Sequence, residues 1–98
     1  MERERKRQEL EKRERKRHAH LTGLVPRLSE LWATVHALAE EQKSSSYDRV
    51  CTLLVDMRDA YAQAGRRPEF DAEFARFLGQ SSRRTALVRK LKEVRLTS

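Results

Sequence analysis

Apolar residues between Tyr47 and Leu78 follow two helical periods separated by one break. The first period places apolar side chains at intervals of three and four residues, on Val50, Leu53, Leu54, Met57 and Tyr61. The second, after the break at residues 65–68, comprises Phe70, Phe74, Phe77 and Leu78. Each period puts one apolar face on a helix whose other directions are charged. The pattern therefore predicts a hairpin of two amphipathic helices, with the three phenylalanines packed in a core rather than free to stack on bases.

Turn and capping residues mark the ends of these helices. Gly65 suits the left-handed position after a helix, and Pro68 suits the first turn of the next one. Because the connection is short, the two helices are expected to pack antiparallel. The serines at 44–46 predict a turn, with Ser45 and Asp48 forming a near capping box, and Ser82 is expected to cap a last helix.

Two more helices are expected on either side of the hairpin. The earlier one carries its apolar face on Leu24, Leu28, Leu31, Val35 and Leu38, with Trp32 beside it. Thr22 or Gly23 could introduce this helix, with Pro26 in its first turn, but a single long helix kinked near Pro26 fits the sequence as well. The last helix is expected to turn Leu87, Val88, Leu91 and Val94 inward.

The segment before these helices has a different composition. Residues 2–17 contain nine Lys or Arg and five Glu, and Leu10 is their only aliphatic side chain. Glu to Lys or Arg spacings of four residues favour a helix, but no apolar seam exists for a coiled coil. We predict an all-α fold: a small helical bundle or a helical-hairpin array like tetratricopeptide repeats, preceded by a charged N-terminal helix. The predicted division is a basic arm at residues 1–20 and a small helical domain at residues 21–98.

Composition limits the function further. The 98 residues are 38% apolar and 38% charged, with a net charge of +7 that is concentrated at the two ends of the chain. Basic ends suit a polyanionic partner such as nucleic acid. The single cysteine, Cys51, is expected to be a buried structural thiol in a reducing compartment. Without an apolar run of membrane length or a signal-peptide pattern, the expectation is a cytoplasmic protein that does not contact membranes.

Metal and catalytic chemistry are not indicated. His18 and His20 are two residues apart, a spacing that a helix turns to different sides, so we expect no metal site and no cofactor. The serines occupy predicted caps, the acidic residues have basic neighbours, and no glycine-rich phosphate loop occurs. The sequence therefore predicts a non-enzymatic protein without a small-molecule substrate.

The part of the chain from about residue 31 to 96 resembles a known family. Trp32, Tyr47-Asp48, Leu53-Leu54 with Arg58-Asp59, Gly65-Arg66, Glu69-Phe70 and the basic helix from Arg83 to Leu91 are similar to the C-terminal helical tail of bacterial SWIM zinc-finger proteins. The CxC and CxH ligands that name the family are missing, because one cysteine cannot form such a site. The resemblance implies a helical appendage, either stand-alone or separately made, that contacts partner proteins or DNA.

Two functions remain as hypotheses. The first is a helical interaction module, a small scaffold or accessory subunit in a larger assembly, that binds a protein partner or a second copy through exposed apolar residues such as Trp32 and Tyr61. The alternative is a subunit that grips the nucleic-acid backbone without reading sequence. The candidate backbone contacts are Arg3, Arg5, Lys6, Arg7, Arg13, Arg15, Lys16, Arg17, Arg83, Arg84, Arg89, Lys90, Lys92 and Arg95.

Overall fold

The computed structural model describes residues 2–97, which form five α-helices and one short 3-10 turn. The elements are α1 (Glu2–Leu24), η1 (Val25–Arg27), α2 (Leu28–Glu40), α3 (Ser44–Gln63), α4 (Arg67–Gln80) and α5 (Thr85–Glu93). No strand occurs among the described residues, so the prediction of an all-α helical bundle is confirmed. The tetratricopeptide-like arrangement and the division into arm and domain stay predictions. Met1 and Ser98, the outer residues of the two predicted domains, lie outside the described part.

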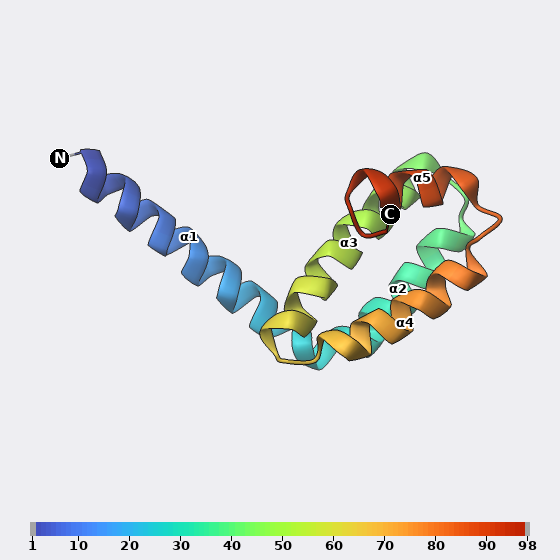
Figure 1. Ribbon diagram of the computed structural model, residues 1–98, viewed down its shortest axis with the longest axis horizontal. Helices are drawn as coiled ribbons and strands as arrows, with labels where there is room; N and C mark the ends of the chain where they lie inside the picture. Colours follow the sequence, from blue (N-terminus) through green and yellow to red (C-terminus); the bar gives the residue numbers. More distant parts are fainter. Residues whose placement is uncertain (1, 98) are drawn as a thin grey trace.

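The bundle is built around α3. This helix contacts α1, α2, α4 and α5, and Figure 1 shows it opposite the adjacent α2 and α4, with α5 across one end. Its fully buried side chains are Val50, Leu54, Met57 and Ala60, which repeat at three and four residues as the periodicity predicted. Leu53 lies at the edge of this face and is half-buried. The central helix therefore buries one broad face and leaves the rest for polar contacts.

An aromatic layer joins α2, α3 and α4. The Phe70 ring lies 5.9 Å from Trp32, 5.7 Å from Tyr61 and 5.5 Å from Phe74, measured between ring centroids. Phe70, Phe74 and Phe77 are all buried, so the prediction that the phenylalanines form core is confirmed. Aromatic rings bury large apolar areas, and this layer supplies much of the packing that holds α4 to the rest.

The N-terminal helix leaves the bundle as a projecting rod. In Figure 1 the blue part of α1 extends away from the other helices, and every described side chain up to residue 20 is exposed. The radius of gyration is 15.6 Å, larger than the roughly 13 Å of a compact chain of 100 residues. The principal extents of 53 × 25 × 22 Å reflect this projection.

The boundary near Pro26 is a kink in a continuing helical path. Thr22 and Gly23 lie inside α1, and the Thr22 hydroxyl donates a hydrogen bond to the His18 carbonyl oxygen instead of capping a new helix. The turn η1, with Pro26 in it, then leads directly into α2. Of the two alternatives left open by the sequence, the kinked helix is the correct one. Proline lacks the N–H that a straight helix would need at this point.

The α3–α4 connection follows the sequence closely. Gly65 has φ 72°, its N–H donates to the Ala62 carbonyl at 3.1 Å, and the Arg66 N–H donates to the Tyr61 carbonyl at 2.7 Å. These two bonds are the Schellman motif, which needs a left-handed residue at the position of Gly65. The predicted glycine stop is therefore confirmed.

Two predicted serine caps are wrong. Helix α3 begins at Ser44, with Lys43 at the N-cap and no side-chain cap bond, so Ser45 lies within its first turn. Ser46 instead donates a hydrogen bond to the Glu41 carboxylate. Helix α5 begins only at Thr85, and the Ser82 hydroxyl donates to the Gly79 carbonyl oxygen at 3.2 Å. Short polar side chains have several backbone partners within reach, and tertiary packing selected others.

The end of α5 also differs from the prediction. Leu87 and Leu91 are fully buried and Val88 is half-buried, but Val94 is 39% exposed. The helix ends at Glu93, and Val94 is its C-cap residue. Leu96 turns back against the core instead, through a bond from its N–H to the Leu91 carbonyl oxygen. The early helix end therefore rotates Val94 outward.

Candidate interaction surfaces

The most exposed charged surface is the outer arm, residues 2–16 of α1. Its seven candidate basic residues are all exposed: Arg3, Arg5, Lys6, Arg7, Arg13, Arg15 and Lys16. A helix turns by about 100° per residue, so these side chains point in several directions and form no single basic face. Lys12, which was not among the candidates, belongs to the same surface. One ion pair occurs among the described outer-arm residues, between Arg7 Nε and Glu11 Oε1 at 3.7 Å.

Arg17 fixes the arm to the bundle. Its guanidinium donates to Asp56 Oδ1 and to Asp59 Oδ2, both at 2.9 Å, and these hydrogen bonds raise the pKa of Arg17. One helical turn later Leu21 is the first buried side chain of α1. Gln63 completes the junction by donating to the Thr22 hydroxyl at 2.8 Å and to the His18 carbonyl at 3.1 Å. Arg17, predicted as a free backbone contact, is therefore a structural anchor.

The second basic surface lies on and around α5. Arg83, Arg89, Lys92 and Arg95 are exposed and Arg84 is half-buried. Lys90, predicted on the free side, donates to Asp48 Oδ1 of α3 at 2.6 Å, and this hydrogen bond raises its pKa. The expectation that Lys90 is unpaired is therefore wrong, because α5 packs its Lys90 side against the start of α3.

The two basic surfaces are not brought together. In Figure 1 α1 leaves the bundle at the end where α3 finishes, whereas α5 crosses the part of α3 that contains Asp48 and Cys51. A ligand that contacted both surfaces would have to run along most of the molecule. Each surface is therefore a separate candidate.

Trp32 and Tyr61 are not exposed, contrary to the expectation. Trp32 is 9% and Tyr61 5% exposed, and the indole Nε1 donates to the Tyr61 hydroxyl at 3.0 Å. Arg66 covers the Tyr61 ring, with its guanidinium carbon 5.4 Å from the ring centroid. Trp32 lies beside the apolar face of α2, and packing against Phe70 of α4 draws it into the core.

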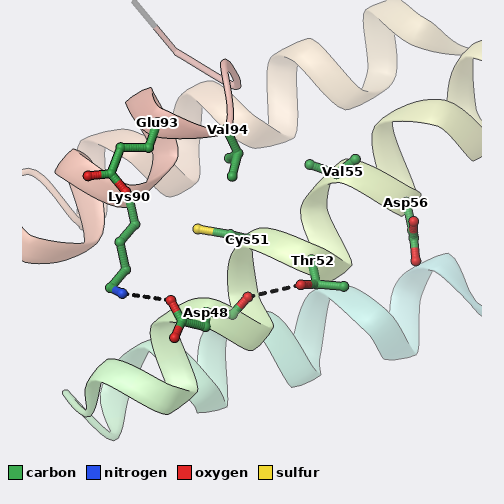
Figure 2. Close-up of a pocket in the computed structure, with 8 residues that line it drawn as sticks. All are labelled: Asp48, Cys51, Thr52, Val55, Asp56, Lys90, Glu93 and Val94. Atoms are coloured by element: carbon green, nitrogen blue, oxygen red, sulfur yellow. Dashed lines mark hydrogen bonds and ion pairs between the residues drawn. The ribbon is translucent and has the colours of Figure 1, made fainter.

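A groove of about 390 Å³ lies between α3 and α5 (Figure 2). Apolar atoms come from Cys51 and Val55 of α3 and from Val94, while Asp48, Asp56, Lys90 and Glu93 surround them. Figure 2 shows the Cys51 sulfur pointing toward α5 and the Lys90–Asp48 ion pair closing one end. Burial, followed by the negative charge of Asp48, raises the pKa of Cys51. The sequence missed this groove because it depends on the contact between two helices about 40 residues apart.

The histidines do not form a ligand cluster. His20 Nε2 lies 3.6 Å from Asp56 Oδ2, and His36 packs its ring 5.5 Å from Phe77. Among residues 2–97 no group of three or more His, Cys, Asp or Glu side chains is arranged to hold a metal ion. The same described residues contain no helix with the length and apolar character needed to cross a membrane.

Comparison with known proteins adds no further constraint. No family model, curated protein or solved structure matches the chain. The similarity to the SWIM tail therefore stays a prediction from the residues quoted above.

Proposed function

We propose that this protein is a non-enzymatic helical interaction module, a small scaffold or accessory subunit, and that the outer arm is its main binding element. One observation carries the proposal: the outer arm is an ordered helix whose side chains are all exposed, attached to a bundle that buries its own apolar residues. Its 15 residues would extend about 22 Å at 1.5 Å per residue. A rod of this kind offers a partner a preformed helical surface.

The root of the arm supports this role. Arg17, Leu21 and Gln63 fix α1 to α3 through ion pairs, burial and hydrogen bonds. Because these contacts set the direction of α1, the rod has a defined orientation relative to the bundle. A partner that binds the arm is therefore placed at a fixed position relative to the bundle, as a scaffold requires.

The groove chemistry is in keeping with a non-enzymatic protein. Its one nucleophilic atom, the Cys51 sulfur, belongs to a side chain with 5% exposure and a raised pKa, both of which disfavour the reactive thiolate. The adjacent Lys90 is held by Asp48. Neither group is in a state suited to covalent or acid–base catalysis near neutral pH.

The test compares partner capture by the full chain and by a chain lacking residues 1–15. The shortened chain keeps Arg17 and Leu21, so it is expected to melt within a few degrees of the parent and to serve as a folded control. After nuclease treatment, proteins captured from cell extract are quantified by mass spectrometry. The proposal expects at least one protein to depend on the arm. Equal capture profiles for the two chains would contradict it.

A second candidate function is sequence-nonspecific binding of a nucleic-acid backbone. The excess of exposed Lys and Arg on the outer arm and around α5 favours it. Each phosphate contact on duplex contributes about −0.9 to the slope of log K against log salt. Deleting residues 1–15 and replacing Arg83, Arg84 and Arg89 with Gln are each expected to flatten the slope and to weaken all sequences alike. Failure of the parent to retain random-sequence duplex or single strands at low salt would exclude this candidate.

A further inference from the structure

Two large apolar side chains are exposed among residues 2–97, and they occupy different surfaces. Leu10 on the outer arm is 56% exposed, and Val94 at the groove between α3 and α5 is 39% exposed. The rest of the large apolar residues are packed in or against one core. Apolar area without a partner gains free energy when another apolar surface covers it.

The charges around these two residues are complementary. On a helix, residues three and four positions away flank a side chain, and for Leu10 these are Lys6, Arg7, Arg13 and Glu14. Three of these four are basic. Around the groove the charged residues are Asp48, Asp56, Glu93 and Lys90. Arg17 from α1 binds Asp56, and carboxylates still outnumber cations at this site. The excess of carboxylates is notable on a chain with a net charge of +7.

The arm of the same chain does not reach the groove. Helix α1 is continuous from Glu2 to Leu24 and is fixed to α3 at Arg17 and Leu21. Leu10 lies 11 residues before Leu21, which is about 16 Å further out along the helix. Figure 1 shows this part of α1 pointing away from the bundle. The complementary surfaces can therefore meet only between two molecules.

We propose that the groove between α3 and α5 receives the outer arm of a second copy of this chain, with Leu10 against Val55 and Val94. Each copy has one arm and one groove, so two copies can exchange arms and close a symmetric dimer with two equal contacts. The inference rests on the proposed function, because it uses the outer arm as the binding element and names its partner. It also explains why a leucine occurs in an otherwise polar helix.

The test measures self-association of the full chain by sedimentation equilibrium at low salt. The parent is expected to dimerise as its concentration rises. Leu10→Ser and Val94→Ser each remove apolar contact from one side of the interface and should weaken dimerisation by roughly tenfold or more. Gln8→Ser is the matched control, because residue 8 lies about 160° around the helix from Leu10. Circular dichroism verifies that the variants keep the parent's helix content, as expected for exposed positions.

A mixture of the two defective variants provides a sharper test. The Val94→Ser chain still has an intact arm and the Leu10→Ser chain an intact groove, so one complete contact can form between them. The mixture is therefore expected to associate more strongly than either variant alone. No gain on mixing, or a Val94→Ser chain that dimerises like the parent, would overturn the inference, the latter because the arms would then meet each other.

The outcome separates this inference from the proposed function. A parent chain that remains monomeric up to near-millimolar concentration overturns the dimer. If that monomer still captures a protein through its arm, the proposed function stands. If it captures none, both fail.

Discussion

The indole Nε1 of Trp32 donates a hydrogen bond to the hydroxyl of Tyr61 across 3.0 Å, in the buried contact between α2 and α3. The two residues are 29 positions apart, and each satisfies a polar group that would otherwise be buried beside Phe70. Tyr61 is also the residue whose carbonyl accepts the Arg66 N–H at the end of α3. One side chain thus links the core to the turn that starts α4.

Tyr61→Phe is expected to lower the free energy of unfolding by about 1–3 kcal/mol, because it leaves the buried indole N–H without an acceptor. Urea denaturation measures the change. Tyr47→Phe is the control, since Tyr47 is 6% exposed and its hydroxyl makes no hydrogen bond to other described residues. Equal losses for the two variants would mean that the bond contributes nothing beyond burial.

Leu54→Ala is expected to cost about 2–5 kcal/mol, because Leu54 is fully buried on α3 and its truncation leaves a cavity. The neighbouring Leu53 is half-buried, so Leu53→Ala should cost clearly less. Thermal melts of the two variants give the comparison. If Leu53→Ala proved the more damaging change, the rotation of α3 described above would be incorrect.

Arg95→Gly is expected to stabilise the fold by about 0.5–1 kcal/mol. Arg95 has φ 61° and occupies the left-handed position of a Schellman motif at the end of α5, where a side chain is strained. Lys92→Gly is the control, because residue 92 is helical and glycine there should destabilise by a similar amount. The denaturation midpoints should therefore move in opposite directions, and a lower midpoint for Arg95→Gly would contradict the assignment.

Cys51 is expected to make stability depend on pH on the alkaline side. Its pKa is raised in the folded chain, first by burial and then by Asp48. Above the ordinary thiol pKa of about 8.5, the unfolded chain loses this proton while the folded chain keeps it. The free energy of unfolding therefore falls as pH rises through this window. The fall should be shallower in Cys51→Ala, and parallel curves for parent and variant would show that the thiol does not contribute.

Much of the bundle follows from local rules in the sequence. The buried faces of α2, α3 and α4 recur at three and four residues, and that spacing is a property of the helix itself. The stop at Gly65 is equally local, because a left-handed residue is needed within five positions of Tyr61. The charged outer arm has no apolar face at any helical rotation, so its exposure also follows from composition.

The tertiary structure decided the candidate surfaces. Arg17 meets Asp56 and Asp59 across about 40 residues, and Lys90 meets Asp48 over a similar separation, so no local pattern distinguishes these cations from free ones. Trp32 lies beside the apolar face of α2 and is buried only because α4 returns against it. Val94 is exposed because α5 ends at Glu93. The periodicity of a helix fixes which residues share a face, but only packing between helices determines which face is covered and which charges meet.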